Sequence, residues 1–431
     1  MENKKEPTAL KPYLGLWSET AINVGAIIGG GIFVVTGIAA GSAGSALVVS
    51  MILAAIIAVF TAVSFAELTA WQPMEGSIYE YARQLVSPFS GFLTGWMWIV
   101  SNTFAGAAVA LGFAYYLNSA FPVLPVNVIA ALICLAFTAL NFVGIRQSAV
   151  FNNVLVATKL TILGFFVVLG SLHVDTNNFM PFAPFSVGVF YGAYFIFFAY
   201  GGFARVAVVA EEVKDAKRTV PRAILLSLAI STVVYILVGM VAVGLVGSTS
   251  LSNSSSPLTY AIGATGSSLA MQIVSLGGLV ATASVLLTSV LGVSRMAYAM
   301  ARRKDMPQVL SRLHGKLNTP YYSIWIAGVA MALLVLFVDL TQVVAVSTFA
   351  ILFYYAIANI AAIKLENENR RYHKLVHWVG LGTCLTLFGF SIFASTSAWV
   401  IGIVCLSIGA IAYGVKEYAT RRKTENSPLR N

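Results

Sequence analysis

Two glycine-rich interruptions of apolar segments are the features of this sequence best suited to holding a solute. The first is NVGAIIGGGIF over 23–33, and the second is FFAYGGFAR over 197–205. Each glycine weakens a helix by about 1 kcal/mol relative to alanine. Unwinding exposes the N–H groups of a helix N-terminus, which attract a carboxylate, and carbonyl groups that accept from an ammonium group. The pair of breaks therefore predicts a site for a zwitterion, whereas one isolated glycine-rich span is more readily explained by close helix packing.

A lysine inside another apolar segment is the second candidate. Lys159 lies in LVATKLTILGFF, seven residues into the segment 152–172. Charged residues within membrane spans are rare and usually functional. The alternative is that this side chain reaches the aqueous boundary, which is about 10 Å away at about 1.5 Å per residue. Because burial favours neutral lysine, a side chain that is charged in one state and neutral in another can carry a proton.

The composition indicates the environment in which these residues lie. The chain has 431 residues, of which 58% are hydrophobic and 10% are charged, whereas a soluble domain is about 25% charged. This composition excludes a soluble enzyme, a disordered chain and a fibrous protein, and it indicates an all-α polytopic membrane protein. The sequence contains no nucleophile-and-base arrangement and no metal-ligand spacing, and its 3 cysteines are dispersed in apolar runs. We therefore expect no enzymatic activity, no metal and no cofactor.

Twelve apolar segments are candidates for membrane spans, which need about 20 residues each. They lie near 16–41, 44–71, 90–118, 126–143, 152–172, 187–211, 222–247, 268–301, 321–338, 341–363, 374–394 and 397–418.

The distribution of basic residues orients these segments. Of the 26 Lys and Arg residues, all but Lys159 and Arg205 fall in the tails or around the connections that follow even-numbered segments. The six connections on the opposite side contain none. Since Lys and Arg accumulate on the cytoplasmic side, we expect a cell-membrane protein with both termini in the cytoplasm. The net charge of +10 is thereby explained without nucleic-acid binding.

The two glycine-rich segments are five spans apart, so the second enters the membrane from the opposite side. Interrupted spans at matching positions of two inverted halves indicate a transporter binding site. We expect a cytoplasmic tail over 1–15, a single transporter domain over 16–418 and a cytoplasmic tail over 419–431. Within the domain, the first repeat covers 16–172, the second covers 187–363, and helices 11 and 12 cover 374–418.

Four motifs, which occur in order, resemble those of the amino acid–polyamine–organocation permeases. They are AINVGAIIGGGIFVVTG, SFAELTAWQPMEGSIYEYARQ, FFAYGGFARVAVVAEEVKDAKRTVPRAI and GVSRMAYAMARRKDMP. The resemblance covers nearly all of 12–320 and is weaker beyond. It implies the LeuT-type fold, in which spans 1–5 and 6–10 are inverted repeats and spans 1 and 6 are broken. It also implies transport of amino acids and related amines.

The same resemblance assigns the residues of a substrate site. The backbone of 29–31 is expected to meet the substrate carboxylate, and the carbonyls of 27, 198 and 199 its amino group. The ring at 198 aligns with an aromatic gate, and core packing is its alternative explanation. The predicted substrate-binding residues are Ile27, Gly29, Gly30, Gly31, Phe198, Ala199, Gly201 and Gly202.

The sequence resembles a proton-coupled prokaryotic branch of that family. In this branch, a lysine at the position of Lys159 occupies the volume in which sodium-coupled relatives bind sodium. The resemblance implies that its ammonium group contacts the carbonyl of Gly25 and the hydroxyl of Ser284 or Thr288. We therefore predict proton coupling and sodium independence. A permanently charged lysine in an exchanger would also exclude sodium.

Several positions depart from the family pattern or argue against further roles. Many members carry Glu where this chain has Ala204, followed by Arg205, so cationic substrates are not expected. Arg205 is expected to pair with Glu67 or with a glutamate at 211–212. A counter-charge for an acidic substrate or a gating ion pair is the minority interpretation. The four histidines are assigned to loops or their edges, which gives little support for a histidine proton pathway. The connection 119–125 has no cysteine, so no disulfide-linked partner chain is expected.

The leading functional prediction is secondary transport of neutral amino acids across the bilayer, coupled to protons and operating by alternating access. The first alternative is an exchanger of amino acids or amines without net proton flow, which needs substrate on both sides of the membrane. The second is an amino acid sensor, which the short tails at both ends disfavour.

Overall fold

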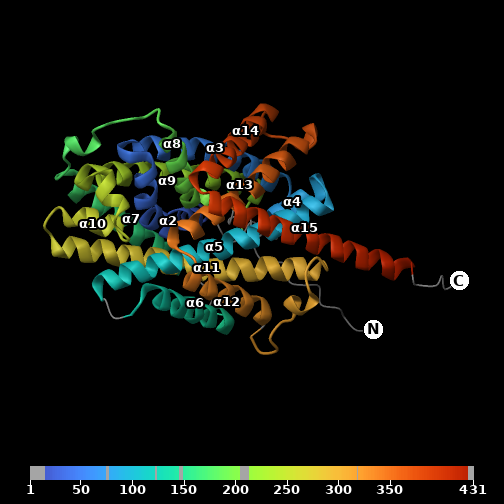
Figure 1. Ribbon diagram of the computed structural model, residues 1–431. Helices are drawn as coiled ribbons and strands as arrows, with labels where there is room; N and C mark the ends of the chain where they lie inside the picture. Colours follow the sequence, from blue (N-terminus) through green and yellow to red (C-terminus); the bar gives the residue numbers. More distant parts are fainter. Residues whose placement is uncertain are drawn as a thin grey trace.

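The computed structural model describes residues 15–73, 77–121, 124–144, 149–203, 213–317 and 319–425, and these form a bundle of helices (Figure 1). The predictions for Ala204, Arg205 and the glutamates at 211–212 lie outside the described residues. In chain order the α-helices are α1 (Leu16–Ile27), α2 (Gly30–Ala43), α3 (Leu47–Trp71), α4 (Ser77–Leu85), α5 (Pro88–Ala120), α6 (Val126–Val143), α7 (Ala149–Ser171), α8 (Val187–Tyr200), α9 (Ala216–Ser252), α10 (Pro257–Gly263), α11 (Ser268–Arg302), α12 (Tyr321–Phe337), α13 (Leu340–Lys364), α14 (Lys374–Ala394) and α15 (Thr396–Glu425).

Local sequence signals set where several helices begin and end. The side chain of Ser87 accepts the N–H of Ser90, and Pro88 is the first residue of α5, as expected of a capped N-terminus. Asp339 caps α13 in the same way, through the N–H of Gln342. Gly144 ends α6 in the left-handed region, with φ of 84°, a conformation that costs glycine little.

The described chain is helical and contains nine segments that are long and apolar enough to cross a membrane. One of these segments, Gly30–Trp71, contains both α2 and α3, and two further apolar helices are shorter, at Val187–Phe203 and Tyr321–Phe337. The prediction of an all-α polytopic membrane protein is therefore confirmed.

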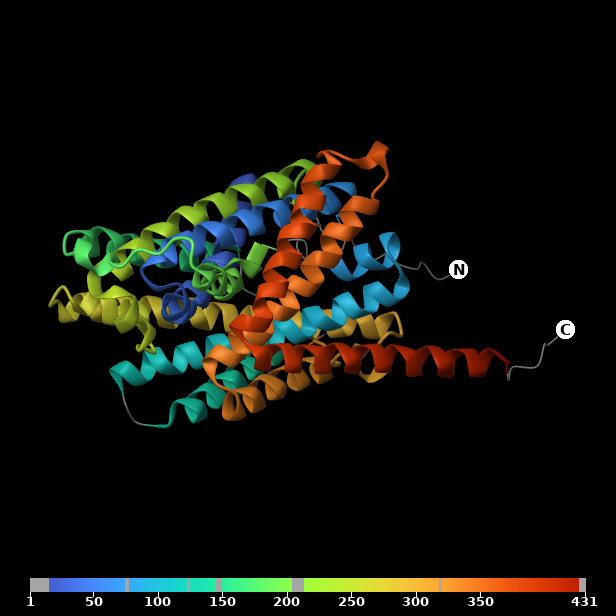
Figure 2. The same cartoon turned by 45° about the horizontal axis from the view of Figure 1, so that its top comes forward.

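The helices divide into an interior and a periphery. The spanning windows of α5 and α13 are 83% buried, whereas that of α15 is 17% buried. Large apolar side chains of α15, including Val400 and Ile411, are exposed, as expected of a helix whose side chains face lipid. The C-terminal part of α15 extends past the other helices (Figures 1 and 2). Near the interior, α2 packs against α8, and α3 packs against α8 and α9.

Two short helices lie in connections for which the sequence predicted no helix, namely α4 and α10. The first is held by Asp305, whose buried carboxylate accepts from Tyr79 Oη at 2.5 Å and Arg83 Nη1 at 2.7 Å and also pairs with Lys416. These contacts join α4, the connection after α11 and the far end of α15. Because several donors satisfy this buried charge, it stabilises the junction.

Packing of α6 against α12 supplies a test of the fold. A Cβ on Gly328 would lie 1.7 Å from Thr138 Oγ1, and that hydroxyl donates to Cys134 O at 2.6 Å. Overpacking of this kind costs about 1–3 kcal/mol, so Gly328→Ala is expected to lower the thermal unfolding midpoint of the detergent-purified protein. Gly389→Ala is the control, because a Cβ there meets nothing within 4 Å. Equal midpoints for the two variants would contradict this packing.

Candidate functional site

The first glycine-rich segment is interrupted between α1 and α2. Ile28 has ψ of 69° and Gly29 is extended, so the helix stops for two residues. The N–H of Gly29 donates to Ile27 O at 2.8 Å. The first N–H groups of α2, beginning at Gly30, have no carbonyl in a preceding turn to bind. The positive end of the α2 dipole is therefore free to act on an anion.

The second glycine-rich segment lies at the end of α8. The helix ends at Tyr200, and the N–H of Gly201 donates to Phe198 O. Residues 201–203 form a short 3₁₀ turn, and the described chain resumes at 213.

The two glycine-rich segments approach each other backbone to backbone. A Cβ on Gly31 would lie 2.8 Å from Ala199 Cα, and a Cβ on Gly202 would lie 2.2 Å from Ala26 O. Neither neighbour is the flexible end of a side chain. Glycine is required at both positions because only a residue without Cβ allows this separation.

Tyr235 of α9 links the two segments and was missed by the sequence analysis. Its buried hydroxyl lies 2.6 Å from Ile27 O and 3.1 Å from Ala199 O, and it donates to these carbonyls. Ile27 O therefore accepts from both Tyr235 and Gly29. These are two of the carbonyls assigned to the substrate amino group. The sequence offered no signal for this role, since Tyr235 is one of 18 tyrosines.

A pocket opens at this junction. Seven of the eight predicted substrate-binding residues line it, and the exception is Gly30, which faces Thr282 and Val109. The sequence analysis did not name the other side of the pocket, which comes from α5, α11 and α13. Its apolar members are Ala105, Val109, Val285 and Ile351, and its polar members are Ser101, Asn102 and Tyr354. No Asp, Glu, Lys or Arg of the described residues lines this pocket.

Lys159 lies inside the bundle and does not reach the aqueous boundary. Its side chain is 2% exposed, and Nζ donates to Gly25 O at 3.3 Å and to Ser284 Oγ at 2.6 Å. These contacts join α7 to α1 and α11. The contact on α1, at Gly25, lies one turn before the break in the first glycine-rich segment. The third predicted neighbour, Thr288, follows one turn later on α11 and donates to Ser284 O at 3.2 Å. The geometry brings the predicted residues together, and their role in coupling stays a prediction.

Two residues outside the pocket occupy unexpected environments. His377 was assigned to the edge of a loop, but it is fully buried in the first turn of α14. Glu67 was predicted to form a structural ion pair. Its carboxylate accepts the backbone N–H groups of Arg371 at 2.5 Å and Tyr372 at 2.9 Å, and it lies 3.9 Å from His377 Nε2, with which it forms an ion pair when that imidazole is protonated.

Comparison with known proteins places the chain in a family. A family model described as amino acid permease matches residues 14–414. An uncharacterized transporter of Mycobacterium tuberculosis is 36% identical over 419 residues, which are 96% of this chain and 94% of the relative. A branched-chain amino acid permease of Bacillus subtilis is 30% identical over 381 residues, 84% of this chain and 82% of the relative.

A third relative carries a different name. The methylthioribose transporter of Bacillus subtilis is 30% identical over 428 residues, which are 93% of this chain and 92% of the relative. The family match covers nearly the whole chain, including both glycine-rich segments and Lys159. The chain therefore belongs to the amino acid permeases of the amino acid–polyamine–organocation family, which are membrane transporters of amino acids and related solutes and not enzymes.

Proposed function

We propose that this permease is a secondary transporter that carries neutral amino acids in symport with protons. The observation that carries the proposal is the buried ammonium group of Lys159, held by Gly25 O and Ser284 Oγ. A tethered cation at this point excludes a sodium ion. It is joined directly to α1, one turn from the substrate pocket, so gain or loss of its proton alters a contact with the broken helix. Burial supplies the energetic reason for proton release in one state of the transport cycle.

The lining of the pocket supports a neutral substrate. The N-terminus of α2 suits a carboxylate, and the carbonyls at 27 and 199 suit an amino group once the Tyr235 hydroxyl gives way. The described lining offers valine, isoleucine and alanine side chains and no counter-charge. A substrate with a charged side chain would enter this pocket without compensation. The name of the branched-chain permease relative agrees with this assignment.

We further propose the architecture in which transport takes place. In this proposal α1 and α2 together form span 1, α8 and the residues after it form span 6, and the described helices belong to twelve spans. Spans 1–5 and 6–10 are inverted repeats in a single transporter domain over 16–418, and both termini lie in the cytoplasm. The absence of Lys and Arg from the six connections on one side supports this orientation.

The glycine contact between the two breaks generates the first functional prediction. Gly202→Ala forces a Cβ to within 2.2 Å of Ala26 O, which separates the carbonyls that meet the substrate amino group. Binding of labelled leucine to purified protein is expected to be lost, because a displacement of about 1 Å is enough to disrupt such a site.

Gly164→Ala on α7 is the matched control, since a Cβ at that position meets nothing within 4 Å. It is expected to bind leucine like the wild type. If Gly202→Ala binds leucine normally while folding normally, the junction is not the substrate site.

A second prediction concerns coupling. Wild-type protein in proteoliposomes is expected to accumulate neutral amino acids under an inward proton gradient and to ignore a sodium gradient. Lys159→Ala is expected to lose the proton-driven accumulation. The control is Thr158→Ala, because the Thr158 hydroxyl donates to Val154 O of its own helix at 2.9 Å. Methylthioribose belongs in the substrate panel because a relative is named for it.

Two results of the uptake measurement would overturn the coupling scheme. Accumulation that persists in Lys159→Ala would exclude this lysine as the proton carrier. Uptake that occurs only against preloaded internal amino acid would make the protein an exchanger, in which Lys159 is a fixed structural cation.

A further inference from the structure

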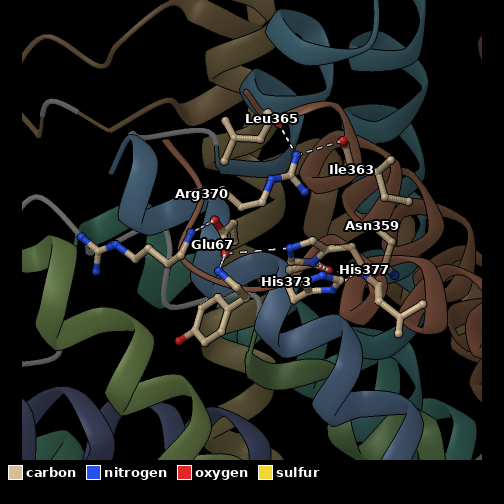
Figure 3. Close-up of polar contacts among 11 residues, drawn as sticks. Glu67, Asn359, Ile363, Leu365, Arg370, His373 and His377 are labelled. Atoms are coloured by element: carbon tan, nitrogen blue, oxygen red, sulfur yellow. Dashed lines mark hydrogen bonds and ion pairs between the residues drawn. The ribbon is translucent and has the colours of Figure 1, made fainter. Parts of the chain in front are cut away.

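A buried polar cluster lies where α3, α13 and α14 meet (Figure 3), and none of its members lines the pocket. Its ionisable members are Glu67 of α3 and His377 of α14, and both are fully buried. Ser64 and Asn359 connect them to the interior. A buried carboxylate beside a buried imidazole is costly unless each is satisfied by hydrogen bonds or charge, so the hydrogen-bond partners determine what the pair can do.

The hydrogen bonds fix which nitrogen of His377 carries a proton. Asn359 Nδ2 donates to Tyr355 O at 2.9 Å and to Thr61 Oγ1 at 3.1 Å. Because a backbone carbonyl only accepts, the orientation of this amide is set, and Asn359 Oδ1 faces Ser64. The Ser64 hydroxyl donates its single proton to that oxygen at 2.7 Å. His377 Nδ1, at 2.8 Å from Ser64 Oγ, must then donate to it.

This assignment leaves His377 Nε2 as the nitrogen that gains and loses a proton. Nε2 is buried without a hydrogen bond among the described residues, and the nearest acidic atom is Glu67 Oε2 at 3.9 Å. In neutral His377 the lone pair of Nε2 faces a carboxylate oxygen, and the two repel. A proton on Nε2 converts that repulsion into an ion pair.

The surrounding charges act in opposite directions on such a proton. Glu67 attracts it. Arg370 opposes it from the α13–α14 connection, where Nη2 donates to Ile363 O at 3.2 Å and to Leu365 O. A cation bound to these last carbonyls of α13 is stabilised by the helix dipole. Burial of the imidazole opposes the charged form as well. With burial and Arg370 against the proton and Glu67 in favour of it, the proton is exchangeable and is not held permanently.

Other ionisable groups near the pair add little. Burial, together with Glu67, raises the pKa of Tyr372, which stays neutral. The side chain of Arg371 turns toward Lys217 O at 2.6 Å and is exposed. From α9, Arg222 acts on Tyr372, α13 contributes the exposed Lys364, and α14 contributes Cys384, which bonds to Thr61. α8, which packs on α14, has no acidic, basic or histidine residue over Val187–Tyr200.

The cluster is connected to the substrate pocket by direct contacts. Tyr355, whose carbonyl accepts from Asn359, donates its hydroxyl to Gly201 O at 3.1 Å. Its ring also packs on Phe65 and Phe203, with ring centroids 5.3 Å and 5.0 Å apart. Gly201 lines the pocket. A change in the hydrogen bonds of Asn359 therefore reaches the second glycine-rich segment through one residue.

We propose that His377 Nε2 and Glu67 form a proton-binding site, separate from Lys159, whose occupancy sets how firmly the α13–α14 connection is held to α3 and thereby the rate of transport. With the proton bound, Glu67 Oε2 holds both Nε2–H and the N–H of Tyr372. Without it, the same oxygen is repelled by Nε2 while it still accepts from Tyr372. The site does not depend on proton coupling at Lys159, so its titration persists in Lys159→Ala.

The first test observes the proton directly. The full chain has 4 histidines, so ¹⁵N-histidine labelling gives four resolvable side chains, and His377→Asn assigns the buried one. As the pH is lowered, Nε2 of His377 is expected to gain a proton while Nδ1 stays protonated. Glu67→Gln keeps the size of the side chain and is expected to shift that transition to lower pH. A His377 that keeps one protonation state throughout, or that loses its Nδ1 proton, would overturn the site.

The second test links the site to transport. Uptake is measured with equal pH on both sides of the membrane, so that no proton gradient contributes. His377→Asn retains a donor at the place of Nδ1 and is expected to lose the part of the pH dependence that follows the His377 transition. Glu67→Gln is expected to shift it. His173→Asn changes an exposed histidine and serves as the control. If the pH profiles of wild type and His377→Asn coincide, occupancy of the site does not set the transport rate.

Discussion

The backbone contact between the two glycine-rich segments is the constraint on which the rest of the structure depends. At Gly31 and Gly202 the chain comes so close to Ala199 and Ala26 that no Cβ fits. Because of this contact, the N-terminus of α2 and the carbonyl groups near the end of α8 lie at the same pocket. Backbone groups that leave a helix within a membrane must each be satisfied by protein or by substrate. Tyr235 meets part of that need by donating to one carbonyl from each segment.

Charged side chains buried in the bundle follow a common rule. Lys159 is held by a carbonyl and a hydroxyl, Asp305 by two cations and a phenol, and Glu67 by two backbone N–H groups. Each of these charges joins parts of the chain that are distant in sequence. Removing one partner of such a contact leaves a buried charge uncompensated, which costs several kcal/mol. In a transporter, a contact that is strong in one conformation and absent in another biases the equilibrium between them.

Tyr355 connects the pocket to the Glu67–His377 cluster. Its hydroxyl binds the second glycine-rich segment, and its carbonyl binds Asn359. In the scheme proposed above, proton occupancy and substrate binding act on neighbouring hydrogen bonds of this residue. The two sites are coupled if the hydrogen-bond arrangement with the proton bound has a different affinity for the substrate from the arrangement without it. The effect is then reciprocal, as in any linkage between sites.

Apolar segments and the asymmetry of basic residues were enough to predict an all-helical membrane protein from the sequence, because lipid demands long runs of apolar residues whose backbone is internally bonded. The paired glycine clusters were likewise enough to indicate the junction at which the pocket opens, since broken helices are tolerated in a membrane only where protein buries them or they line a cavity. The sequence could not reveal Tyr235, Asn102 or Ile351, because tyrosine, asparagine and isoleucine side chains acquire a role only through their neighbours.

His377 shows the same limit most clearly. Its position near the start of a span suggested a solvated loop edge, and packing against α3 buried it beside Glu67, 310 positions away in the chain. Sequence spacing determines helices through local hydrogen bonds and hydrophobicity. Only the tertiary structure decides which polar groups of distant helices share one buried volume, and that sharing sets their charge and their chemistry.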